Sequence, residues 1–562
     1  MIFDAFYETM KMKTLISCAF STVALASFGQ LNNGTFTGNI ESTFQYLNAD
    51  SLIDAKQPDS KSLLNSYANV FYTNGNFKAG MRLESYLPRI QGYPDRFEGT
   101  GLGMRYVGYT NSYIDVTLGN FYEQFGSGLI FRSYEDRALG YDNNMDGMRL
   151  IFRPAKGVVL KGVYGRQRLS FTDGKVVKAS GIVRGIDGEI HVNDLLEKYM
   201  KDSKLDIVLG GSFVSKFQID DNPDLILPQN VGAYSGRLGL KYSRFSFNAE
   251  YAVKENDPSE DNTNIYNKGR AALANLGYSQ KGFGIVLSAK SVDNMSFRSD
   301  RTKSLQDVLI NYLPSMNKTH TYNLVATLYP YATQPLGEVA YQAEVLYTFK
   351  KGSKIGGKYG LPINANFSTT YGPIHHTSGF SPTDSTGIAY QGRLFDQSSL
   401  QYWQDININI TKKFNANYSM IFSYFNIRLN NDISKVADDA KGIIESHIGV
   451  VEVNWKINKT NSVRAEFQGL FTKKDKGNWA TAVIEYNVSP NWFFSVMDQY
   501  NYGNPVKDLQ LHYLIGSFGY IRDASRFMVS YGRQRAGLFC VGGVCRFVPA
   551  SNGLTLTFTQ SF

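Results

Sequence analysis

Apolar and polar residues alternate with a period of two along most of this chain, starting near residue 34. The pattern is clearest over residues 553–562, where four apolar side chains share one face: Leu554, Leu556, Phe558 and Phe562. Thr555, Thr557, Thr559 and Ser561 fall on the other face, as a strand requires. About ten residues is also the length with which a tilted strand crosses the hydrocarbon core of a bilayer. The segment is therefore predicted to be a membrane-spanning strand.

The same alternation recurs across the whole chain, at 77–83, 205–213, 245–253, 339–349, 406–410 and 451–457. Short turns are expected at 73–76, 110–112, 155–157, 242–244, 412–415, 458–461, 489–491 and 522–525. Longer polar stretches lie between them, at 49–63, 88–99, 123–146, 254–269, 372–400 and 430–446. Short periplasmic turns alternating with long outside loops are typical of outer-membrane barrels. The predicted fold is all-β, a single large antiparallel transmembrane barrel.

The number of strands follows from their alternating direction. Counted from residue 34, the strand near 283–291 runs outward, and counted back from Phe562, the one near 321–331 also runs outward. Two consecutive strands cannot share a direction, so the region 291–338 contains one missed or one false strand. An even-numbered barrel of 24 or 26 strands is expected. Within this region the helical spacing of Leu305, Val308, Leu309 and Tyr312 predicts a short amphipathic helix.

Residues 1–29 are predicted to be a secretory signal peptide, cut before Gln30. A basic start at Lys13, a short apolar run and small residues at Ser27 and Gly29 carry this prediction. Asp4 and Glu8 suit such a signal poorly, so translation is expected to begin at Met10 or Met12. Residues 30–562 then form the barrel, because no Pro-, Ser- or charge-rich linker divides them.

Composition agrees with a barrel wall. The chain has 37 Tyr, 37 Phe and 52 Gly, while its hydrophobic fraction is an ordinary 43%. Alternating lipid-facing and lumen-facing residues, with aromatic belts at the interfaces, give this combination. The net charge of +9 fits either loops that contact lipopolysaccharide or a basic lumen that favours anions. The basic residues are dispersed and no module signature appears, so nucleic-acid binding is not expected.

The stretch 119–147 mixes glycines, aromatic residues and both signs of charge, unlike a purely solvated loop. In the general porins the third outside loop folds into the lumen, and this loop resembles it in order and length. An inward fold would place four charged residues in a pore constriction: Arg132, Glu135, Arg137 and Asp146. The alternative is a loop that stands outward or continues the wall.

Asp142, Asn144 and Asp146 also match the opening half of a calcium loop, D-x-N-x-D-G. The closing position holds Arg153 instead of Glu, which favours the alternative of an Asn/Asp-rich turn. No other cofactor is expected. The chain has no nucleophile elbow, paired metal-ligand motif or phosphate loop, so we do not expect an enzyme.

Cys540 and Cys545 are the two cysteines left after cleavage of the leader. Gly542 and Gly543 between them allow a tight turn, and the exported compartment is oxidising. A loop disulfide is predicted.

The leader ending at Gln30, the Tyr-, Asn- and Lys-rich strands and the final Phe562 resemble the large outer-membrane barrels of Bacteroidota. The stretch 119–147 and the two-cysteine loop resemble an uncharacterised family of that phylum, a domain of unknown function. This resemblance implies the cell outer membrane and no activity. Phe558 and Phe562 are expected to be the signal read by the barrel-assembly machinery, and lipopolysaccharide is an expected neighbour.

Two functions fit these features. The first is a porin-like channel for small polar solutes, with both mature termini in the periplasm. The second is a non-conducting structural or partner-binding barrel, accessory to an outer-membrane export, assembly or uptake complex. The strands start too early to leave room for the plug domain of a TonB-dependent transporter.

Overall fold

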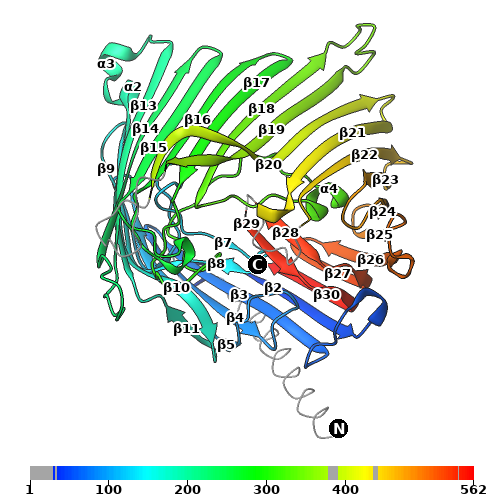
Figure 1. Ribbon diagram of the computed structural model, residues 1–562, viewed down its shortest axis with the longest axis horizontal. Helices are drawn as coiled ribbons and strands as arrows, with labels where there is room; N and C mark the ends of the chain where they lie inside the picture. Colours follow the sequence, from blue (N-terminus) through cyan, green and yellow to red (C-terminus); the bar gives the residue numbers. More distant parts are fainter. Residues whose placement is uncertain (1–29, 32–33, 377–389, 434–440, 542–543) are drawn as a thin grey trace, which may run out of the picture.

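The computed structural model is a closed antiparallel barrel whose wall has 24 strands (Figure 1). It describes residues 30–31, 34–376, 390–433, 441–541 and 544–562, so the predicted signal peptide lies outside the described residues. The first twelve wall strands are β2 Gly34–Asn48, β3 Ser62–Asn74, β4 Phe77–Tyr86, β5 Gly99–Thr110, β6 Ile114–Phe121, β9 Met145–Ala155, β10 Val158–Thr172, β12 Ile182–His191, β13 Leu205–Phe217, β14 Asn230–Tyr242, β15 Phe245–Lys254 and β16 Gly269–Gln280. The other twelve are β17 Phe283–Asp293, β18 Gly337–Phe349, β19 Leu361–His376, β20 Gln391–Lys413, β21 Tyr418–Asn430, β22 Ile443–Lys456, β23 Asn461–Thr472, β24 Trp479–Val488, β25 Trp492–Tyr500, β26 His512–Arg522, β27 Ser525–Gln534 and β30 Ser551–Ser561.

Shorter strands and helical segments lie before or between the wall strands in the sequence. Short strands are β1 Gln30–Leu31, β7 Glu135–Asp136, β8 Tyr141–Asp142, β11 Lys175–Lys178, β28 Gly537–Val541 and β29 Val544–Val548. The helical segments are η1 Ser51–Ile53, α2 Val192–Leu195, α3 Glu197–Met200, η2 Glu260–Asn262, α4 Asn323–Leu328, η3 Asn431–Ile433 and η4 Lys507–Leu509. None of the described helices has the length and apolar character needed to cross a membrane.

The first and last wall strands close the barrel. β2 pairs with β30 from Asn39 opposite Ser561 to Asn48 opposite Asn552, and β27 pairs with the other edge of β30. Every wall strand therefore has two neighbours, so the backbone polar groups are paired within the sheet, as a membrane-spanning sheet requires. The predicted strand at the end of the chain and the predicted barrel of 24 or 26 strands are confirmed.

The outer face of the wall is apolar. Leu160, Ile186, Leu209, Leu276 and Ile484 lie on different strands and are between 43% and 64% exposed. Aromatic rings of neighbouring strands pair beside the short turns, with centroids between 4.4 and 6.4 Å apart in Phe77–Tyr109, Phe245–Tyr278, Phe283–Tyr347 and Trp492–Tyr520. An apolar band that ends in aromatic residues matches the hydrocarbon core and interface of a bilayer. The barrel is built to span a membrane.

The region 291–338 holds the predicted error in the strand count. The strand expected near 321–331 is wrong, because those residues contain α4, and β17 passes directly to β18 in the wall. The helix expected over Leu305 to Tyr312 is also wrong in position. Leu305 and Val308 have φ values of 55° and 46°, which are left-handed and break any right-handed helix. These residues, despite the helix-like spacing of their apolar side chains, lie in a loop instead.

Candidate functional site

Residues 122–144, which join β6 to β9, lie inside the barrel, and we call them the inner loop. Their side chains or backbone contact Glu41 of β2 at 2.6 Å, Arg82 of β4 at 2.7 Å, Lys161 of β10 at 2.8 Å and Glu250 of β15 at 2.6 Å. These wall residues belong to strands far apart around the circumference. A single loop reaches all of them only by crossing the lumen, so the inward alternative is the one the fold adopts.

A second segment, residues 294–336 between β17 and β18, also lies in the lumen, and we call it the strap. The carbonyl of its Leu309 accepts a hydrogen bond from Gln167 of β10 at 2.7 Å. Further along, His320 lies 2.8 Å from Asp405 of β20, and the backbone N–H of Leu324 donates to Gln468 of β23 at 3.0 Å. The strap therefore runs past about half of the wall and ends back at β18.

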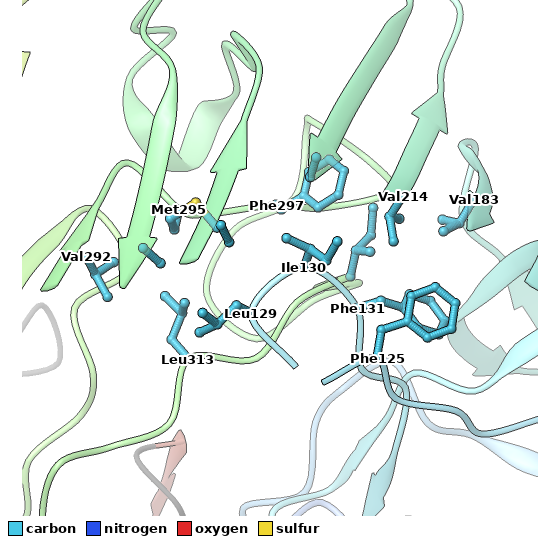
Figure 2. Close-up of a cluster of buried hydrophobic side chains, with 14 of the residues drawn as sticks. Phe125, Leu129, Ile130, Phe131, Val183, Val214, Val292, Met295, Phe297 and Leu313 are labelled. Carbon is cyan, nitrogen blue, oxygen red and sulfur yellow. The ribbon is translucent and has the colours of Figure 1, made fainter. Parts of the chain in front are cut away.

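The inner loop and the strap pack into one unit around an apolar core. Arg132 N–H donates to the carbonyl of Ile310 at 2.8 Å, and Tyr312 N–H donates to the carbonyl of Gly128 at 2.9 Å. Figure 2 shows the side chains that meet around these contacts, and the fully buried ones include Phe125, Leu129, Ile130, Phe131, Val183, Val214, Val292, Met295 and Phe297. Burial of so many apolar groups makes this unit a packed part of the fold.

Ion pairs hold the part of the inner loop around Glu135 and Asp142 to the wall. Both Nη atoms of Arg168 donate to the carboxylate of Glu84, at 2.9 and 2.7 Å, and Nη1 also donates to Asp142 of the loop at 2.9 Å. Arg82 forms a second fork with Glu135, at 2.7 and 3.0 Å. The side chains of Arg168 and Glu84 are 1% and 0% exposed, so these charges depend on one another for compensation.

The predicted constriction residues do not converge on one passage. Arg132 lies over two rings, with its guanidinium carbon 4.3 Å from the centroid of Tyr134 and 4.0 Å from that of Tyr312. Asp146 sits at the start of β9, with Lys178 at 2.6 Å and Arg105 at 3.3 Å.

The remaining two constriction residues, Glu135 and Arg137, lie together near β2. Arg137 is 3.1 Å from Glu135, 2.6 Å from Glu41 and stacked over Tyr67 at 4.3 Å. Burial alone would lower the pKa of Arg137, but the neighbouring carboxylates outweigh burial and raise it. Arg137 therefore stays charged, and its charge fastens the loop.

The three residues of the predicted calcium motif are engaged with other groups. Asp142 accepts from Arg168, and the amide of Asn144 donates to both oxygens of Asp142, at 3.0 and 3.1 Å. Asp146 faces Lys178 and Arg105. Over the described residues no group of three or more His, Cys, Asp or Glu side chains is arranged to hold a metal ion. The motif forms part of the ion-pair network, and calcium binding stays a prediction.

The two cysteines lie on the β28–β29 hairpin, which we call the tip hairpin. Its register places Cys540 directly opposite Cys545, and cross-strand neighbours have Cα spacings that suit a disulfide. Gly542 and Gly543 lie outside the described residues. The hairpin contacts α4, and Arg546 donates to the carbonyl of Gly92 at 2.8 Å, so it also belongs to the lumen assembly.

The predicted assembly signal lies at the closing seam. The backbone of Phe562 exchanges hydrogen bonds with Gly38 of β2 at 2.9 and 3.0 Å. A Cβ on Gly38 would come within 2.5 Å of the Phe562 ring, so glycine is required for this close approach. Phe558 lies four residues earlier, opposite Ser42 of β2.

Several inward lysines of the wall were not foreseen from the sequence. Lys216 of β13 and Lys254 of β15 are fully buried near Asp257, at 2.6 and 3.9 Å, and Lys290 of β17 lies 2.5 Å from Glu338. The alternation along each strand places these lysines on the polar face, but every ordinary lumen-facing residue follows the same alternation. Their position along the strand is the signal that could have identified these lysines, because each lies near the long-loop end of its strand, where the strap passes.

Comparison with known proteins places the chain in one family. DUF6029, a family of unknown function, matches residues 10–562, and no curated protein matches the chain. The P pilus usher (PapC) translocation pore is 8% identical, over 93% of this chain and 99% of that chain, with a TM-score of 0.41. The outer-membrane protein opdK from Pseudomonas aeruginosa is 10% identical, over 83% and 100%, with a TM-score of 0.35. The siderophore receptor PiuA from Acinetobacter baumannii is 10% identical, over 93% and 82%, with a TM-score of 0.38.

Proposed function

The chain belongs to the DUF6029 family of unknown function, and we propose that it is an outer-membrane channel for small polar solutes, narrowed from within. A barrel of this strand number encloses an aqueous lumen unless inner segments fill it. The inner loop carries the proposal, because it contacts β2 and β4 on one side and β15 on the other. Together with the strap it turns a wide lumen into a restricted one.

The wall opposite the inner loop supports a polar path. Polar side chains on this side of the wall remain partly exposed, and they include Glu344 of β18, Arg464 of β23 and Glu485 of β24, which are between 28% and 38% exposed. Such groups replace water around a polar solute, whereas the apolar core of Figure 2 excludes it. The passage is therefore expected between the strap and this wall.

Recording the purified, folded protein in a planar bilayer tests the proposal. We expect discrete current steps well below those of an open barrel of the same strand number. A heat-modifiable, correctly folded protein that stays silent would reject the channel. The non-conducting scaffold would then be the better account, since the tightly packed lumen core is the observation that favours it.

The remaining parts of the proposal concern location. The short turns would face the periplasm and the long loops would face the outside and its lipopolysaccharide, with the tip hairpin at the outer end of the lumen. The assembly machinery would read Phe558 and Phe562, and Cys540 would be linked to Cys545. No enzymatic activity or cofactor is part of the proposal.

A further inference from the structure

A cavity of about 480 Å³ opens at the long-loop end of the lumen, between the inner loop, the strap and the tip hairpin. Its volume lies within the range of about 300–1,000 Å³ that is usual for small-molecule sites. Most of its lining is apolar or aromatic, including Leu139, Leu309, Leu336, Leu538 and Phe547. A lining of this kind favours a ligand with an apolar body.

The cavity lining carries more positively than negatively charged side chains. Arg96 pairs with Asp307, and Arg298 lies 3.4 Å from Asp261, so four of the five charged lining residues compensate one another. The fifth is Arg546, which has no ion pair with any described acidic residue. Its Nη1 donates to the carbonyl of Gly92, while its buried Nε has no hydrogen-bond partner among the described atoms. Burial lowers the pKa of this guanidinium, and the charge of Asp136 offsets only part of that effect.

The strap turn beside the cavity is held in an unfavourable backbone conformation. Leu305 and Val308 both have left-handed φ values, which are rare for residues other than glycine and rarest for a β-branched one. Arg298 fixes the turn by donating to the carbonyls of Leu305 at 2.6 Å and Asp307 at 2.7 Å. The result is a leucine side chain in the cavity lining that is 64% exposed. Strain of this kind is found preferentially where a segment is shaped for a ligand.

From these observations we infer that the cavity binds a small carboxylate with an apolar body, with Arg546 holding the carboxylate and Leu305 contacting the body. A planar guanidinium suits a carboxylate because two N–H groups match its two oxygens. The inference adds a ligand class to the proposed channel function. Passage of that ligand through the barrel rests on the proposed function, whereas its binding in the cavity does not. A free organic acid and the carboxy terminus of a short peptide share this chemistry.

Calorimetric titration of the full-length barrel in detergent tests the inference with matched probes. One pair is 3-phenylpropionate and its neutral amide, and the other is the dipeptide Leu-Phe with a free or an amidated carboxy terminus. We expect each carboxylate to bind at least about tenfold more tightly than its amide, the effect of one charge-assisted contact. The pair with the larger difference identifies the source, free acid or peptide.

Variants assign the preference to Arg546. Arg546→Gln should abolish the difference within each pair, whereas Arg546→Lys should keep most of it, which separates charge from a merely structural role. Arg522→Gln is the control, since this arginine is 73% exposed at a short turn. Equal affinity for carboxylate and amide, an undiminished preference in Arg546→Gln, or no binding of any probe would overturn the inference. Because binding is measured without current, a protein that binds but does not conduct would reject only the channel.

Discussion

Single residues of the lumen act mainly by pairing with one another. Glu84 is fully buried and binds Arg168 with both oxygens. Glu84→Gln should therefore leave a buried guanidinium short of charge and lower the free energy of unfolding by about 3 kcal/mol. Urea unfolding in lipid vesicles measures the loss.

The matched control for this prediction is Glu485→Gln. Glu485 is 3.2 Å from Arg464, but the two side chains are 38% and 28% exposed, so the change should cost less than about 1 kcal/mol. If both variants unfold at the same urea concentration, the buried network is not what holds the inner loop.

The closing seam depends on Phe562 and the glycine beneath its ring. Phe562→Ala and Gly38→Ala should each lower the amount of heat-modifiable barrel in the outer membrane, the first by losing the ring and the second by displacing it. Quantitative blotting of outer-membrane fractions measures this amount. Phe467→Ala is the control, because this ring is 53% exposed on the wall and away from the seam. Wild-type levels for both seam variants would contradict the assembly role.

At the scale of elements, periodicity predicted the wall because each strand has a lipid face and a lumen face. It also located its own error, since alternating direction confined the false strand to 291–338. The strap could not be predicted, because its residues are buried by a lumen that only the closed barrel creates. Val308 illustrates this: helical spacing suggested one face of a helix, whereas tertiary contacts hold it in a left-handed turn.

The long loops differ in how far they reach solvent. In the loop after β15, Asp257, Ser259 and Asn262 are at most 2% exposed, whereas Ile219 and Ile226 in the β13–β14 loop are 67% and 82% exposed. Protease added to intact cells should therefore cut within 219–226 and spare the short turn at 458–461. Mass spectrometry of the fragments locates the cuts. Cleavage confined to the short turns would reverse the proposed orientation.

The whole molecule combines a predictable wall with an interior that was predictable only in part. The mixed composition of 119–147 pointed to an inward loop, but its charges were expected to line a passage. They instead fasten the loop, because a charged group inside a low-dielectric core needs a partner within reach. Arg137→Glu would place a third carboxylate beside Glu41 and Glu135, so charge reversal there tests loop docking and not ion selectivity.

The central claim is that the inner loop narrows an otherwise open lumen. Single-channel conductance of wild type and of a variant lacking 127–141 tests it most directly, with a deletion of 221–225 from the exposed β13–β14 loop as the control. We predict a severalfold larger conductance for the first deletion and an unchanged one for the control. Equal conductance for all three folded proteins, or none from any of them, would contradict the account.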